Sequence, residues 1–230
     1  MRRAVTALLG TLVNVIAIVI GGTLGVIIGD KLKERYKVTV MQGLSLAVIL
    51  IGLEMAIKTN NISIVIFSLI LGGLFGESLK IEHRLKEIGE WFEEKLKKQG
   101  EVAEAFIQCS LIYCVGAMAI MGAIQDGLVN DPSILYAKSM LDGFSAIAFS
   151  STLGIGVILS AIPVFLYQGL IALFAGYLKP LLTDPVVTEM TATGGMLIVA
   201  IGLNLLEITE IKIGNLLPAI FVAVLLLYLI

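Results

Sequence analysis

A lysine, an aspartate and two hydroxyls lie along one face of an otherwise apolar stretch, and together they could bind a polar ligand. Lys138, Asp142, Ser145 and Thr152 follow one another at intervals of 4, 3 and 7 residues. In a helix that turns about 100° per residue, these intervals place the four side chains in one narrow stripe. Lys138 and Asp142 can pair there, which lowers the cost of carrying either charge. The stripe predicts either a polar binding site or a buried ion pair that holds helices in register.

The rest of the chain has the composition of a membrane protein. Of its 230 residues, 58% are hydrophobic and 15% are charged, whereas soluble domains have about 45–50% and about 25%. The apolar residues lie in blocks of about 18–25, the length that crosses a hydrocarbon core of about 30 Å. We therefore predict a single all-α transmembrane domain over residues 1–230, with membrane lipid as a partner. The net charge of −2 gives no indication of nucleic-acid binding.

Eight apolar segments predict a polytopic helix bundle. The first follows Arg2 and Arg3 but is longer than the core of a signal peptide, so we expect a retained helix. The segments are Ala4–Ile28, Thr39–Ile57, Ile62–Leu79, Ala103–Ile124, Leu135–Leu153, Gly156–Leu178, Val186–Leu206 and Lys212–Ile230. In the seventh, Thr191, Thr193, Gly194 and Gly195 are expected to interrupt the helix.

The hydrophilic stretch Lys80–Lys98 predicts an amphipathic helix, because apolar residues recur in it at intervals of 3 or 4. Trp91 and Phe92 suit a position at the lipid headgroups. With eight crossings, four basic residues lie on the same side of the membrane as the N-terminus and eleven lie on the opposite side. The positive-inside rule then places the amphipathic helix in the cytoplasm and both termini outside. A re-entrant fifth segment would instead place the C-terminus inside.

Two parts of the chain are similar to each other. Val48–Glu54 resembles Ile198–Asn204, which lies 150 residues later. Gly22 and Gly29 likewise lie 147 residues before Gly169 and Gly176. We infer that segments one to three are repeated as segments six to eight, with two helices inserted between. Five crossings separate the copies, so the second is inverted, as in many transporters.

Further polar residues fall at a depth similar to that of Asp142 when each segment is measured along its length. Asn14 either bridges helices or faces a polar cavity. Pro163 and a double glycine can release backbone groups at this level. Carboxylate, amide and backbone carbonyl oxygens together suit Na⁺, a proton or a small polar solute. The predicted binding residues are Asn14, Lys138, Asp142, Ser145, Thr152, Gln168, Gly194 and Gly195, with Glu54 and Asn204 as secondary candidates.

The sequence gives no sign of enzyme chemistry. It has no dinucleotide fingerprint, no Walker loop and no HExxH motif, and His83 is its one histidine. Cys109 and Cys114 lie on different sides of a helix, which disfavours a metal pair. Ser150 lies on another face from Lys138, which disfavours a serine–lysine dyad. We therefore expect no catalytic residue, no cofactor and no metal.

Several stretches across nearly the whole chain resemble the uncharacterised bacterial integral-membrane family that includes YqgA and YdfK. They are Gly10–Asn14, Met41–Leu44 with Ile51–Gly52, Leu141–Phe144, Gly154–Val157 and Tyr167–Gly169. The resemblance implies a multi-pass protein of the bacterial inner membrane. It implies no activity.

These observations predict a transporter or channel for an ion or a small polar solute, with its site near the bilayer midplane. The alternative is a scaffold or sensor that acts through the amphipathic helix. Glycine ridges on the first and third segments, Gly21, Gly25 and Gly29 on one and Gly72 and Gly76 on the other, predict a homo-oligomer, most simply a symmetric dimer.

Overall fold

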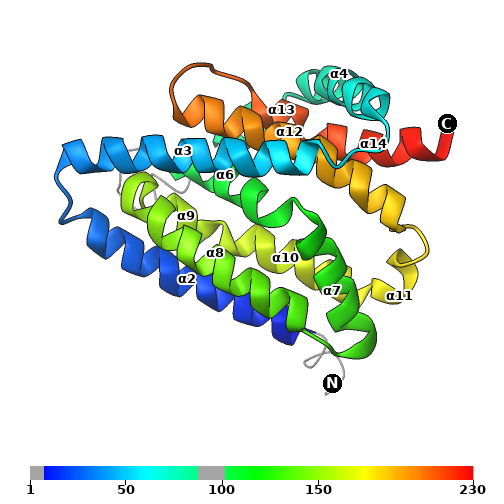
Figure 1. The fold of residues 1–230 in the computed structure, drawn as a ribbon, viewed down its shortest axis with the longest axis horizontal. Helices are drawn as coiled ribbons and strands as arrows, with labels where there is room; N and C mark the ends of the chain where they lie inside the picture. The colour runs from blue at the N-terminus through cyan, green and yellow to red at the C-terminus, as the bar shows by residue number, and fades with distance from the viewer. Residues whose placement is uncertain (1–7, 88–101, 230) are drawn as a thin grey trace. The chain divides into compact units, whose positions relative to one another are not determined.

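A computed structural model describes residues 8–87 and 102–229, and every regular element in them is helical (Figure 1). The predicted all-α class is confirmed. The elements are α2 (Leu9–Gly29), α3 (Glu34–Ala56), α4 (Ile62–Leu79), α6 (Val102–Cys114), α7 (Ala117–Val129), α8 (Ser133–Leu153), α9 (Gly156–Leu159), α10 (Ala161–Leu173), α11 (Ala175–Leu178), α12 (Asp184–Leu205), α13 (Ile213–Leu216) and α14 (Pro218–Leu229). Residues 81–87 are also helical, and the remainder of the predicted amphipathic helix lies outside the described residues.

Five helices within the described residues are long and apolar enough to cross a membrane. They are Leu9–Gly29, Arg35–Ala56, Ile62–Leu79, Gly156–Leu173 and Asp184–Leu205. The pair α6 and α7 makes a sixth span if the two are counted together. The other two predicted segments are helices as well: α8 has 21 residues, and α13 with α14 forms a shorter apolar helix. The chain is thus a membrane protein with several transmembrane helices.

The fourth predicted segment is bent by 61° between α6 and α7. Gly116 has a φ of +136° at this bend, a conformation that side chains other than glycine rarely adopt. The prediction that this segment ends at Ile124 was wrong, because α7 begins after the bend and continues to Val129. As a result, Asp126 lies in a helix and not in the following loop.

The described chain divides into two compact units. Unit 1 contains α2 and α6 to α11, and unit 2 contains α4, α12 to α14 and most of α3. Each unit therefore combines two stretches that are separate in the sequence. The predicted single domain is in this sense divided.

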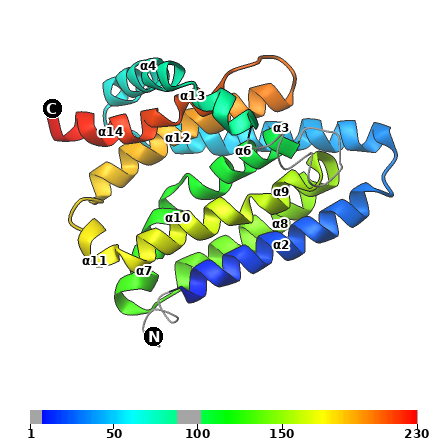
Figure 2. The ribbon, with the colours of Figure 1, turned by 180° about the vertical axis from the view of Figure 1, so that it is seen from behind.

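In unit 1, α2 and α8 run side by side in the same direction, as both views show (Figure 1, Figure 2). The glycine ridge of α2 lies against the backbone of α8. A Cβ at Gly25 would collide with the carbonyl oxygen of Ile147, and one at Gly29 with that of Ser151. The ridge therefore packs within the chain. The same holds for Gly72 and Gly76 of α4, which contact Ala219 and Asn215 of unit 2. The glycines on which the dimer prediction rests thus already pack against helices of the same chain. The dimer stays a prediction.

The helices α9 and α10 run antiparallel to α2 in unit 1. Ile158 of α9 contacts Gly22 near the end of α2, while Gln168 of α10 contacts Asn14 near its beginning. Ser160 separates α9 from α10, three residues before Pro163. Proline lacks the N–H that would continue the helix there, which accounts for the break. The predicted release of backbone groups near Pro163 agrees with this break.

In unit 2, α3 and α12 cross where each carries a glycine. A Cβ at Gly52 would meet Gly195 and Val199, and a Cβ at Gly202 would meet Ser45 and Ile49. Adding 150 to Gly52, Ser45 and Ile49 gives Gly202, Gly195 and Val199. The two sets of contacts are therefore related by the same shift as the sequence similarity, and the antiparallel crossing is what an inverted repeat requires. The repeat itself stays a prediction.

The helix α12 is continuous from Asp184 to Leu205. The prediction that Gly194 and Gly195 interrupt it was wrong. Glycine lowers helix propensity by about 1 kcal/mol relative to alanine, but Gly195 lies at the crossing with Gly52, where the close backbone approach needs a residue without a side chain. Packing therefore overrides the local preference.

The helix directions predict that α8 crosses the membrane fully. α8 is parallel and α10 antiparallel to α2, which is the alternation that a fully crossing α8 would produce. We expect a cysteine added after the C-terminus to react with an impermeant thiol reagent in intact cells, because both termini then lie outside. A variant with cysteine in place of Lys58, on the same predicted side, serves as a labelling control. Protection of the C-terminal cysteine would instead indicate a re-entrant α8.

Candidate functional site

Four of the predicted binding residues meet inside unit 1. Asn14 of α2 donates from Nδ2 to Oδ2 of Asp142 in α8 at 3.0 Å and to Oε1 of Gln168 in α10 at 3.4 Å. Lys138 donates from Nζ to the same Asp142 oxygen at 2.6 Å. Asn14 and Gln168 are fully buried, and Lys138 and Asp142 are each 6% exposed. We call Asn14, Lys138, Asp142 and Gln168 the Asp142 cluster.

The local sequence explains why these side chains point inward. Asn14 lies on the face of α2 that also carries Gly10, Ile18 and the glycine ridge, all of them buried. On α8, Lys138 and Asp142 are one turn apart, so both lie on the same buried face. The parallel packing of α2 on α8 then brings Asn14 and Asp142 to one level.

Two atoms of the cluster have no hydrogen-bond partner within the described residues. They are Oδ1 of Asn14, which can accept, and Nε2 of Gln168, which can donate. Leaving a buried polar atom unpaired costs about 1–3 kcal/mol. The cluster can therefore satisfy both an acceptor and a donor on a small polar solute, in addition to the charged pair.

The charged pair gives the cluster an electrostatic balance. The Lys138 ammonium and the Asp142 carboxylate together carry no net charge, which limits the cost of holding them at membrane depth. A cation or a proton that entered the cluster would compete with Lys138 for the Asp142 carboxylate. Tyr113 and Cys114 of α6 lie within electrostatic range of Asp142. Nothing in the spacing of these two residues along the chain links them to α8.

The two hydroxyl residues of the predicted stripe, Ser145 and Thr152, are not in the cluster. The Ser145 hydroxyl donates to the backbone carbonyl of Asp142, one turn earlier. The Thr152 hydroxyl donates to the carbonyl of Phe149. Thr152 is ten residues beyond Asp142, a rise of about 15 Å along the helix. The four residues lie on one side of α8, as the spacing predicted. Only Lys138 and Asp142 lie at the same depth as Asn14.

The remaining candidates lie in unit 2. Gly195 packs against Gly52, with Gly194 beside it in α12. Glu54 pairs with Lys58 on the surface at 2.9 Å. Asn204 accepts from the backbone N–H of Ile211 at 2.9 Å and donates to its carbonyl at 2.8 Å, which fixes the loop after α12. These are contacts that stabilise the fold, and a ligand role for these residues stays a prediction.

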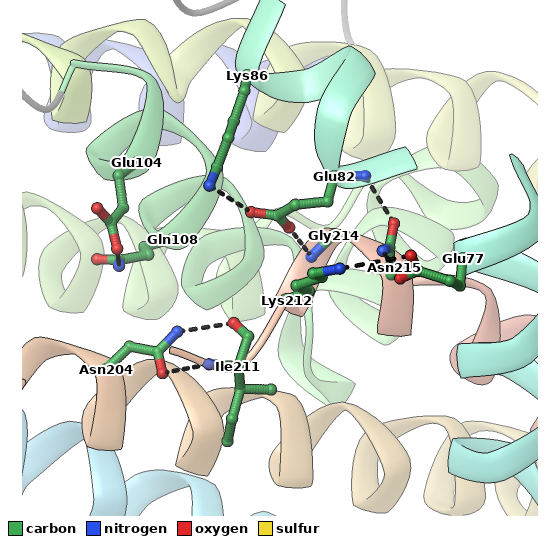
Figure 3. A network of polar contacts seen from close by, with 10 residues as sticks. All are labelled: Glu77, Glu82, Lys86, Glu104, Gln108, Asn204, Ile211, Lys212, Gly214 and Asn215. Atoms are coloured by element: carbon green, nitrogen blue, oxygen red, sulfur yellow. Dashed lines mark hydrogen bonds and ion pairs between the residues drawn. The ribbon is translucent and has the colours of Figure 1, made fainter. Parts of the chain in front are cut away.

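A polar network that the sequence did not indicate joins α4 to α13 in unit 2, as Figure 3 shows. Asn215 accepts from the N–H of Glu82 at 2.8 Å and donates to Glu77 at 2.6 Å. Glu82 in turn accepts from the N–H of Gly214 at 2.7 Å. Lys212 pairs with Glu77 at 3.4 Å. Most of these bonds satisfy backbone groups or link exposed side chains, so the network anchors the two helix ends.

A buried carboxylate in unit 2 has a similar anchoring role. Glu189 of α12 is 1% exposed, and it accepts from the Thr59 hydroxyl at 2.6 Å and from the N–H of Asn60 at 2.8 Å. These bonds hold the connection between α3 and α4. The sequence showed Glu189 only as an acidic residue at the start of a segment, since the partner turn lies about 130 residues away.

The fold and the cluster define an α-helical, multi-pass membrane protein with a buried, charged and incompletely paired polar site. The chain belongs to the family described as "Protein of unknown function (DUF554)", whose model matches residues 9–228. The resemblance seen in the sequence is thereby confirmed.

Two relatives are similar over nearly their whole length. The uncharacterised protein YqgA of Escherichia coli (strain K12) is 33% identical over 223 residues, which cover 94% of each chain. The uncharacterised membrane protein YdfK of Bacillus subtilis (strain 168) is 30% identical over 217 residues, which cover 93% of each chain. No solved structure matches the chain.

Proposed function

We propose that this protein carries an ion or a small polar solute across the membrane through the Asp142 cluster, as a transporter or a channel. The observation that supports this most is the charged pair Lys138–Asp142, buried among three helices beside an unpaired acceptor on Asn14 and an unpaired donor on Gln168. A purely structural ion pair needs no such additional groups. The protein is not an enzyme in this proposal, and its place is the bacterial inner membrane.

The depth of the cluster suits a site that opens to one side. Asn14 is five residues from the beginning of α2, and Gln168 is five residues from the end of α10. Both distances correspond to a rise of about 8 Å. Asp142 lies near the middle of α8. The cluster therefore lies about a quarter of the way along α2 and nearer to the end of unit 1 where α2 begins.

The chemistry favours a positively charged species. Asp142 accepts two hydrogen bonds at one oxygen, from Lys138 and Asn14. A proton or Na⁺ that bound this carboxylate would release Lys138, and the positive charge of Lys138 would in turn favour its departure. Competition of this kind lets a site bind and release a cation without tight retention.

The alternative function, a scaffold or sensor, would act through Lys80–Lys98. Residues 81–87 of this stretch form a helix, and residues 88–98 lie outside the described part of the chain. Glu82 and Leu85 lie against Gly214 in unit 2, so the start of the stretch is bound to the fold. The transport proposal has the more specific support.

Flux measurements on purified protein in liposomes test the proposal. We expect Asp142→Asn to abolish uptake of H⁺ or Na⁺, because the neutral amide cannot take up a proton and attracts a cation far less than a carboxylate does. For a neutral solute, the same variant should lose the stabilisation that the solute gives in a thermal screen. Because the amide leaves the Lys138 ammonium without its counter-ion, this variant should be less stable than the wild type. The Lys138→Met/Asp142→Leu variant removes both charges and gives the same flux comparison in a folded protein. Asp131→Asn, in the exposed loop after α7, is the control. Wild-type flux and ligand response in Asp142→Asn would contradict the proposal.

A further inference from the structure

Unit 1 contains a second buried carboxylate outside the Asp142 cluster. Asp126 of α7 is 0% exposed, and its Oδ2 accepts from the backbone N–H of Gly10 at 2.8 Å. Its Oδ1 has no hydrogen-bond partner within the described residues. No lysine, arginine or histidine forms an ion pair with it in this part of the chain. Burying a carboxylate without an ion-pair partner costs free energy of folding.

One part of this arrangement has a structural explanation. Gly10 is the second residue of α2, and the residue before α2, Leu8, has no side chain that could cap the helix. The first N–H groups of a helix lack partners within it, and a carboxylate there also interacts favourably with the helix dipole. Asp126 thus caps α2 from another helix. Capping alone needs one oxygen, which Asn or Ser would also supply.

Further buried polar groups follow Gly10 along α2, between its beginning and the level of the Asp142 cluster. Asn14 follows Gly10 by one turn on the same buried face of α2, a rise of about 6 Å. Side chains on a helix lean toward its N-terminus, so Asn14 leans toward Gly10 and Asp126. Thr11, the residue after Gly10, is fully buried as well, and its hydroxyl has no hydrogen-bond partner within the described residues. Gly10 adds no side chain to this space, because a Cβ there would collide with Leu135 and Asp126.

We propose that Asp126 is the outer carboxylate of the path to Asp142, where a proton or a monovalent cation binds before it reaches the cluster. The proposal rests on the proposed function. A proton that binds here forms an O–H bond at Oδ1, and the hydronium that supplies it becomes water. Oδ2 keeps its bond to the N–H of Gly10 throughout. The path then runs along the beginning of α2, past Thr11 to Asn14 and Asp142.

The variant Asp126→Asn separates this role from capping. Its oxygen still accepts from Gly10, so we expect α2 to stay capped and the melting temperature to stay near that of the wild type. H⁺ and Na⁺ flux into liposomes should fall by about tenfold or more, because the amide does not ionise and carries no negative charge to attract a cation. A capping role alone predicts wild-type flux. Should the Asn variant not fold, Asp126→Ser, which also caps a helix, gives the same comparison.

Asp131→Asn is the matched control, five residues further along the chain. Asp131 is exposed, and bonds from the Ser133 N–H, the Ser133 hydroxyl and the Gln125 amide lower its pKa. It therefore stays ionised near neutral pH without lying on the path, and its loss should leave flux unchanged.

The outcomes distinguish this inference from the proposed function. Flux that needs Asp142 and falls in Asp126→Asn supports both. Flux that needs Asp142 but is unchanged in Asp126→Asn overturns the role of Asp126 alone. A wild-type protein that carries neither H⁺ nor Na⁺ also overturns it, while the proposed function would then stand or fall on the Asp142-dependent response to a neutral solute.

Discussion

Replacing Lys138 alone with methionine should strongly destabilise unit 1, whereas replacing Lys138 and Asp142 together with Met and Leu should not. The single change leaves the Asp142 carboxylate buried without its cation, and losing one partner of a buried pair costs about 3–5 kcal/mol. The double change removes both charges, and apolar replacements of a buried pair are often neutral or stabilising. Thermal unfolding in mild detergent measures both variants. The double variant should also lose all flux.

The surface pair Lys58–Glu54 provides the control for this experiment. It has the same spacing of four residues and a similar length, 2.9 Å against 2.6 Å, but its side chains are 58% and 66% exposed. Exposed pairs contribute about 0–1 kcal/mol. Lys58→Met should therefore have little effect on stability. Equal effects of Lys58→Met and Lys138→Met would show that the Asp142 pair is well hydrated, and a folded double variant that still transports would end the site hypothesis.

Replacing Gly25 with alanine should force α2 and α8 apart. The new Cβ would collide with the backbone carbonyl of Ile147, and backbone cannot rotate away as a side chain can. Overpacking of this kind costs about 1–3 kcal/mol. Because α2 and α8 carry Asn14 and Asp142, we expect a lower melting temperature together with reduced flux.

Gly43→Ala makes the same chemical change where nothing lies within 4 Å of the added carbon. It should be neutral or raise stability by about 0.5–1 kcal/mol, since alanine favours a helix more than glycine does. Native mass spectrometry adds a second result. If the ridge on α2 instead mediates a dimer, Gly25→Ala should convert dimer to monomer at unchanged stability, which would contradict the packing of α2 on α8.

The sequence alone determined the class of the protein and the angular position of its polar residues. Long apolar blocks fix an all-helical membrane protein, because no other element satisfies its own backbone hydrogen bonds in lipid as simply. The interval of four residues between Lys138 and Asp142 was sufficient to predict their pairing, since helix geometry is local and regular. The glycine spacing on α2 likewise predicted a close helix contact. It did not identify the partner as α8.

Tertiary structure decided which polar residues share a depth and which elements they join. Thr152 lies on the stripe of Asp142 but about 15 Å along the axis, and periodicity gives an angle without a depth. Gly195 looked like a break in α12 and is a packing contact, because the backbone of Gly52 approaches it from another segment. Asp126 looked like a loop residue until the bend at Gly116 let α7 carry it to the start of α2. Asn14 meets Asp142 across 128 residues and Gln168 across 154. Contacts of that separation depend on how whole helices pack, and no local pattern in the chain encodes them.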